Sequence, residues 1–396
     1  MTAKVSRRLV VPDSVRVHRY QNLPELAPSV LFFSGGSALN KIARVLKAYT
    51  HHSIHLVTPF DSGGSSAKLR QAFNIPAVGD LRSRMMALAD ETVLGQPDVF
   101  ELFSYRLPFD ATVVELELEL EQELAALAVG EHPLMQPILA PMKTLITTQL
   151  IRLRSELPKG FDLRGASVGN LIIAGGYLGH GQLLDPIIFL FSRLVKTLGQ
   201  VTTIVDETHH LGVRLESDEV VLGQHQITGK ETAPLAQPIK EIWLNQGLDE
   251  RLPVSAKLPE DRKQLIEQAD LICFPPGSFF TSLVANLLVD GVSHAILNNP
   301  NPKIYLPNLG VDPEQLGWSL MDRVEYLLTL LLGDAERNAT EPVLNWLLID
   351  EHYDYGEIDL ERLTKWGVGV VKTPLIGIKQ HQYSEHLVVQ ALLSFT

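Results

Sequence analysis

Three short loops rich in glycine and serine are the first feature of this sequence that could do chemistry. Each follows an apolar run typical of a strand and precedes a segment with helical spacing. Such a loop brings the backbone close to a ligand, and its N–H groups attract an anion together with the helix dipole. The loops therefore predict a phosphate site. They are Ser34-Gly35-Gly36-Ser37, Ser62-Gly63-Gly64-Ser65 and Pro276-Gly277-Ser278.

The number of these loops matters more than any one of them. A single glycine-rich loop is more often a plain turn. Parallel strands end at one edge of a sheet, so three loops together favour convergence on one crevice. No loop continues into the Gly-Lys-Ser/Thr of a Walker motif, and the GxGxxG dinucleotide pattern is absent. The sequence thus indicates phosphate or nucleotide binding of another kind.

Asp61 stands at the mouth of the second loop and is the candidate catalytic residue. A carboxylate there can hold a magnesium ion beside a polyphosphate, or accept the proton of an attacking hydroxyl. Magnesium is accordingly the expected cofactor. The alternative is that Asp61 only caps the following turn with its side chain.

Two arginines and an asparagine are candidate ligands of the same site. Arg82, two residues after Asp80, and Arg106 could each grip phosphate oxygens with a guanidinium fork. Surface ion pairs are the alternative for both. Asn170 follows Gly169 at the start of an apolar run, where its amide could bind a sugar hydroxyl, a phosphate or a backbone group.

Histidine and cysteine offer no comparable signal. The histidines have no metal-ligand spacing such as HExxH, so we interpret them as solvated or structural. Cys273 lies within an apolar run, which favours a buried thiol over a nucleophile.

Composition limits the partners. The 396 residues are 45% hydrophobic and 20% charged, as in an ordinary folded protein, and the net charge of −12 disfavours nucleic acid and anionic membranes. The expected partner is a nucleotide or another phosphorylated small molecule, and a homo-oligomer is possible. A single cysteine and the lack of a signal-like N-terminus or a long apolar run predict a cytoplasmic protein.

The three repeats of strand, loop and helix predict an α/β fold with a mainly parallel sheet. Residues 90–161 are instead predicted to form a helical insertion or cap, with 142–157 its clearest helix. Within it, residues 115–121 alternate like a strand and 123–127 resemble a helix, so that boundary stays open. We expect one large domain over residues 1–396. Further strands are expected at 202–205, 213–215, 220–222, 242–244, 295–297, 304–306, 344–349 and 368–371.

Several segments together resemble a known family in order and spacing. They are Asp61 to Ser66 with Leu69-Arg70, Gly79-Asp80-Leu81-Arg82, Tyr105-Arg106, Gly169-Asn170-Leu171, Ala269-Asp270-Leu271, and Pro276 to Ser282 with Asn286. On these residues the chain resembles the 2-phospho-L-lactate transferase (CofD-like) family, which includes the bacterial gluconeogenesis factors. The resemblance covers residues 30–308 and is most specific in the last segment.

The resemblance implies a Rossmann-like three-layer α/β/α fold. It implies magnesium-assisted transfer of a phospholactyl group from a guanylyl donor to a deazaflavin alcohol, or, in bacterial relatives, regulation through bound nucleotide sugars. Asp61 would hold magnesium or assist the hydroxyl, and the three loops would seat phosphates. Asn170 and Ser278 would line the nucleotide site. The remaining binding residues implied by the matching segments are Arg70, Asp80, Arg82, Arg106, Gly169, Thr281, Ser282 and Asn286.

The chain departs from the family pattern within these same loops. Ser62 stands where a second aspartate is common, Ala166 where a histidine often precedes the Gly-Asn pair, and Gln224 where a Gly-Glu pair is usual. The first loop has Ser34, Ser37, Ala38 and Asn40 where glycine, threonine, glycine and serine are usual. Two hypotheses follow: a transferase that uses Asp61, and a non-catalytic sensor of nucleotides or nucleotide sugars.

Overall fold

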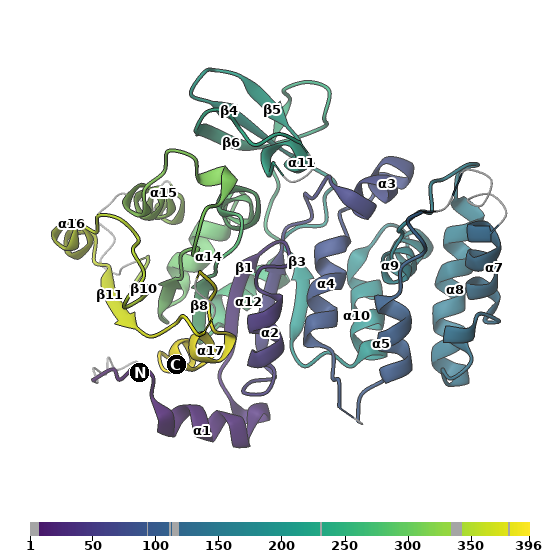
Figure 1. Cartoon of the computed structure of the whole chain (residues 1–396), viewed down its shortest axis with the longest axis horizontal. Helices are drawn as coiled ribbons and strands as arrows, with labels where there is room; N and C mark the ends of the chain where they lie inside the picture. Colours follow the sequence, from purple (N-terminus) through teal and green to yellow (C-terminus); the bar gives the residue numbers. More distant parts are fainter. Residues whose placement is uncertain are drawn as a thin grey trace.

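A seven-stranded parallel sheet forms the centre of the protein in a computed structural model (Figure 1). The model describes residues 8–92, 94–110, 112, 119–229, 232–333, 343–378 and 381–396. Across the sheet the order is β3-β2-β1-β8-β9-β10-β11, so the direction of winding reverses between β1 and β8. The strands are β1 Val30–Ser34, β2 Ser53–Val57, β3 Gln200–Thr203, β8 Leu271–Phe274, β9 Lys303–Tyr305, β10 Trp346–Asp350 and β11 Gly369–Thr373.

Helices cover both faces of this sheet, which confirms the predicted Rossmann-like α/β class. No described helix combines the length and the apolar character needed to span a bilayer. The α-helices are α1 Ser14–Asn22, α2 Asn40–Leu46, α3 Gly64–Phe73, α4 Gly79–Leu88, α5 Pro97–Ser104, α7 Glu121–Val129, α8 Ala140–Glu156, α9 Val168–Gly179, α10 Leu184–Val195, α11 Gln224–Ile227, α12 Glu260–Gln268, α13 Ala285–Leu287, α14 Val292–Asn298, α15 Leu320–Leu332, α16 Leu360–Lys365 and α17 Glu385–Leu393. The shorter turns are η1 Pro24–Leu26, η3 Pro133–Met135, the π-helix η4 Phe279–Val284, and η5 Pro313–Gln315.

Strand β1 shows why the sheet is buried on both faces. All five of its residues are buried, and successive side chains point to opposite faces. Leu31 and Phe33 join the core under α14 and α15. Val30 and Phe32 join the core under α2 and α17. Cys273 of β8 is buried in the second of these cores, and burial raises the pKa of its thiol, as expected for a structural cysteine.

The helical part of the chain lies beyond the β3 edge of the sheet (Figure 1). Helices α5, α7 and α8 fall within the predicted stretch 90–161, and they share one apolar core with α4, α9 and α10. Residues 115–118, where the sequence alternates, lie outside the described residues. The expected single domain with a helical insertion stays a prediction.

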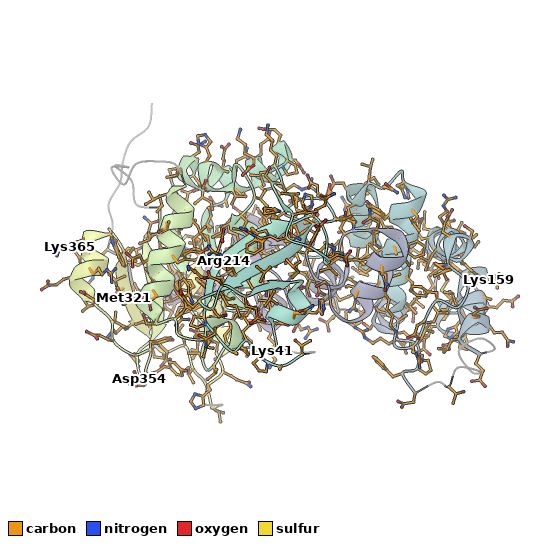
Figure 2. All side chains as sticks on the ribbon, turned by 90° about the horizontal axis from the view of Figure 1, so that it is seen from above. Lys41, Lys159, Arg214, Met321, Asp354 and Lys365 are labelled. Carbon is orange, nitrogen blue, oxygen red and sulfur yellow. The ribbon has the colours of Figure 1, made fainter. Side chains whose placement is uncertain are left out.

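A second, four-stranded sheet is antiparallel and has the order β5-β4-β6-β7. Seen from above, Arg214 of this sheet lies near the middle of the molecule, with Lys159 and Lys365 at opposite ends (Figure 2). The sequence predicted strands here but not their separate sheet, because alternation does not fix the partner or its direction. The strands are β4 His210–Leu215, β5 Val220–Leu222, β6 Ile239–Asn245 and β7 Pro253–Val254.

The strand predicted at 295–297 is wrong, because these residues lie in helix α14. Val292, Ala295 and Ile296 are its buried residues, and their spacing of three and four is helical. A short apolar run is ambiguous between a strand and a buried helix, and the prediction followed the run alone.

Candidate functional site

The three glycine loops follow neighbouring strands of the sheet. Strand β1 pairs with β2 on one side and with β8 on the other, all in parallel. Their carboxyl ends, and hence the loops, lie at one edge. The reversal of winding falls between β1 and β8, and ligands of doubly wound sheets bind at such a point.

The first loop is held by helix α4. The Gly36 N–H donates to Asp80 Oδ2 over 2.7 Å, and Arg84 Nη2 donates to the Gly36 carbonyl over 3.1 Å. Arg84 is fully buried, which lowers its pKa to about 10 despite the opposing effect of Asp80. One helix therefore binds both the N–H and the carbonyl of this loop, and Asp80 takes the place an anion would have at Gly36.

The segment after β8 supports the first loop from the other side. Asn286 Nδ2 donates to the Ser34 carbonyl over 3.1 Å. A Cβ atom at Gly35 would come within 2.7 Å of Ser282 Oγ, so a larger residue here would have to displace the Ser282 side chain. Asn286 and Ser282, both predicted binding residues, thus contact the first loop directly.

The third loop has little capacity left for an anion. The N–H groups of Gly277 and of the first residues of η4 already donate to side chains of residues 308–314. Burial and the charge of Asp312 raise the pKa of Glu314 to about 7. The bonds are Gly277 N–H to Asn308 Oδ1 (2.6 Å), Phe279 N–H to Asp312 Oδ2 (3.0 Å), Phe280 N–H to Glu314 Oε2 (3.0 Å), Thr281 N–H to Glu314 Oε2 (2.9 Å) and Thr281 Oγ1–H to Glu314 Oε1 (2.6 Å).

A cavity of about 130 Å³ separates the first and third loops. Its lining includes the predicted residues Ser34, Gly35, Gly36, Ser37, Pro276, Gly277, Ser278 and Ser282. Ligand pockets for drug-sized molecules have volumes of roughly 300–1,000 Å³. This cavity alone is therefore too small for a nucleotide.

The second loop opens on a larger cleft of about 670 Å³. Asp61, Gly63 and Gly64 line it together with Asp80 and the start of α4. The N-cap of α3 is Gly63, which has no side chain to cap the first turn, and its N–H donates to Asp61 Oδ1 over 3.0 Å. The cleft has the volume of a nucleotide site, and the positive end of the α3 dipole lies at its wall.

Four cationic side chains line this cleft: Lys68, Arg82, Arg106 and Arg164. Lys68 and Arg164 both donate to Asp162, whose single negative charge offsets one of their two positive charges. Arg82 and Arg106 are close enough to repel each other. Burial first, and then the charge of Arg106, lower the pKa of Arg82 to about 10 against the effect of Asp80.

The position of the Arg82 side chain also depends on Gly169 of α9. A Cβ atom at Gly169 would lie 2.7 Å from Arg82 Cδ, so the glycine makes room for this side chain. The Arg82 Nε atom is buried without a hydrogen-bond partner among the described residues. Two neighbouring guanidinium groups, one with an unsatisfied N–H, are a suitable arrangement for an anion.

The other predicted residues have different places. Asn170 lines the cleft at the start of α9. Arg70 does not line it, because its guanidinium donates to the carbonyls of Asp61, Thr208 and His209. Thr281 donates to Glu314 with its N–H and its hydroxyl. Ser65 lies in the first turn of α3.

Ser62 joins the second loop to the segment that follows strand β5 of the antiparallel sheet. Its Oγ lies 2.8 Å from His225 Nδ1 and accepts the His225 backbone N–H over 3.3 Å. His225 belongs to α11 and lines the cleft. Sequence reasoning missed His225 because 163 residues separate it from Ser62. It also missed Lys68, Arg164 and Phe109, which line the same cleft.

The cleft could hold magnesium only with help from a ligand. Among the residues the structure describes, no three His, Cys, Asp or Glu side chains are placed to hold a metal ion. Asp61 and Asp80 line the cleft. Mg²⁺ is commonly bound by one or two carboxylates together with substrate phosphates, and this donor set fits that pattern.

Comparisons with known proteins agree on one family. Residues 30–376 match the family described as 2-phospho-L-lactate transferase CofD. The gluconeogenesis factor of Bacillus subtilis is 25% identical over 378 residues, covering 92% of this chain and 97% of that protein. A protein of Thermotoga maritima that is provisionally described as a gluconeogenesis factor is 30% identical over 343 residues, which cover 84% of this chain and 87% of that protein.

A solved structure shows the same fold. The crystal structure of a UPF0052-family protein from Bacillus halodurans superposes with a TM-score of 0.68 at 22% identity. The match covers 93% of this chain and 99% of the other.

Proposed function

The chain belongs to the 2-phospho-L-lactate transferase CofD family, and from this premise we propose that it transfers a phosphorylated group from a guanylyl donor to an alcohol. The reaction is placed in the cleft over the second loop. The observation that carries the proposal is that Arg82 and Arg106 both line a cleft of nucleotide size, together with Asp61.

Each step of the transfer has a candidate residue. The alcohol oxygen attacks the phosphorus of the group that is transferred. The bond between that phosphorus and the bridging oxygen breaks, and this oxygen leaves with guanosine monophosphate. Arg82 and Arg106 bind the phosphate oxygens as charge moves to the leaving group. Asp61 accepts the hydroxyl proton or holds magnesium. Magnesium, when bound with the phosphates, would neutralise part of their charge.

The relatives' descriptions favour a second candidate function. The Bacillus subtilis relative is described as a gluconeogenesis factor, and Ser62 here binds His225 instead of supplying a second carboxylate. In this alternative the same cleft binds a nucleotide or nucleotide sugar, and the bound state is read by a partner protein.

Ligand-dependent thermal stabilisation separates the two functions. We would measure the melting temperature with GDP and with UDP-sugars, each with and without magnesium, and assay turnover of a guanylyl donor with a deazaflavin alcohol. The transferase predicts magnesium-dependent stabilisation by GDP and turnover that Asp61→Asn abolishes. The matched control, Asp249→Asn, changes an exposed aspartate outside the cleft lining and should keep both the stabilisation by GDP and the turnover.

The opposite results are equally specific. Binding of UDP-sugars without metal, together with no turnover, would reject the transferase in favour of the regulator. Absence of binding by every phosphorylated ligand would reject both.

A further inference from the structure

Phe109 is an exposed aromatic residue in the lining of the cleft. Its side chain is 68% exposed, and of the phenylalanines that the structure describes only Phe189 is comparably exposed, at 63%. A buried phenylalanine side chain stabilises a protein by roughly 1.5–3 kcal/mol relative to an exposed one. Burial therefore explains little of why an aromatic residue stands at this point of the cleft lining.

The backbone holds this residue in place even though its ring is exposed. The segment that leads to Phe109 is bound to the segment before α9. Leu107 N–H donates to the Ala166 carbonyl over 3.0 Å, and Gly165 N–H donates to the Pro108 carbonyl over 3.1 Å. The position of the ring is thus set by hydrogen bonds on its N-terminal side.

Gly165 supports the ring directly. A Cβ atom at Gly165 would overlap the Phe109 ring, and Gly165 has a φ of +66°, which disfavours other residues. Arg106 Nη1 donates to the Gly165 carbonyl over 3.1 Å. One glycine therefore positions both an aromatic ring and a guanidinium group, and both line the same cleft.

We propose that Phe109 is the stacking platform for a planar heterocyclic ring of the ligand, whose phosphate reaches Arg82 and Arg106. This rests on the proposed function, because it uses the same cleft. The ligand class is a nucleoside phosphate: the π-face of the ring stacks on Phe109, and the anionic end pairs with the two guanidinium groups. The ring could also come from a deazaflavin acceptor, which has the same stacking chemistry.

The test compares ligands with and without a ring. We would measure dissociation constants of GDP, inorganic pyrophosphate and a deazaflavin alcohol by calorimetry for Phe109→Ala, Phe109→Trp and the matched control Phe189→Ala. Loss of stacking should weaken GDP binding about 5- to 100-fold in Phe109→Ala and leave pyrophosphate within about twofold. Phe109→Trp should retain GDP binding, and Phe189→Ala should change neither ligand.

Each other outcome has a defined meaning. If Phe109→Ala weakens only the deazaflavin alcohol, the platform exists and the acceptor supplies the ring. If it weakens GDP and pyrophosphate equally, or weakens no ligand, the inference is wrong and the proposed function survives. If the unmodified protein binds neither GDP nor pyrophosphate, the proposed function fails and takes the inference with it.

Discussion

The loops after β2 and β8 share one local sequence pattern and differ in what surrounds them. Both run from a buried strand through glycine and serine into a helix. After β8, the backbone N–H groups donate to Asn308, Asp312 and Glu314. After β2, the loop faces a cleft lined by Arg82 and Arg106.

This difference shows that the elements around a glycine-rich loop decide whether it can bind an anion. Side chains on η5 and just before it provide carboxyl groups that satisfy the helix start after β8, and the negative charge of Asp312 disfavours phosphate there. Helix α4 and the segment around Arg106 bring positive charge to the loop after β2. We therefore assign a structural role to the loop after β8 and ligand binding to the loop after β2.

The largest effect is expected at Glu314. Glu314→Ala should lower the free energy of unfolding by about 3 kcal/mol, because three buried donors lose their acceptor. Glu314→Gln, which keeps an acceptor oxygen, should cost clearly less. Urea denaturation measures both. If both variants lost a negligible amount of unfolding free energy, this carboxylate would not hold the third loop.

A smaller effect is expected from pH. The pKa of Glu314 is raised to about 7, so in folded protein the group keeps its proton at a pH where the unfolded chain has lost it. The stabilisation from this group is complete below the unfolded pKa and is lost as the pH rises through about 7. Unfolding free energies measured between acidic and alkaline pH should decline in this window, and Glu314→Gln should flatten the decline. An unchanged slope in the variant would assign the titration elsewhere.

At the second loop the expected effect is on binding. Arg82→Ala should weaken GDP binding about 10- to 100-fold, since a hydrogen bond to a charged group contributes about 1.5–3 kcal/mol. Arg152→Ala removes an exposed arginine on α8 that pairs with Glu156, and it should leave binding unchanged. Calorimetry with GDP gives both constants. Equal affinities of the two variants would remove Arg82 from the site.

The smallest effect is expected at Ser62. Ser62→Ala removes the hydroxyl that accepts the His225 N–H at the start of α11, and a hydrogen bond of this kind contributes about 1 kcal/mol. Ser155→Ala, which changes an exposed serine near the end of α8, serves as the control. Chemical denaturation should separate the two. A variant at Ser62 as stable as the control would mean that this bond does not fix the antiparallel sheet to the cleft.

The sequence predicted what local patterns determine. The strands at 30–33 and 271–274 and the loops after them follow from apolar runs that stop at glycine, and the parallel sheet follows from their repetition. Their convergence could be anticipated, because parallel strands share one carboxyl edge. The helix at 295–297 was missed because a short apolar run does not distinguish a strand from a buried helix.

Contacts distant in sequence could not be predicted in the same way. Ser62 meets His225 across 163 residues, and Thr281 meets Glu314 through a segment that is not part of the loop pattern. Phe109 looks like any apolar residue until Gly165 is seen to support its ring. Such contacts decide whether the N–H groups of a loop are bound by side chains or the loop faces a cleft. The sequence could therefore identify the three loops but not which of them binds a ligand.

Hydrogen exchange with and without GDP tests this ranking most directly. If the ligand binds over the second loop, GDP should slow amide exchange in peptides covering residues 61–68, 79–83 and 164–170. Peptides covering 277–281 should show no change, because the N–H groups of Gly277, Phe279, Phe280 and Thr281 already donate to side chains. Protection at 277–281 without protection at 61–68 would contradict the account.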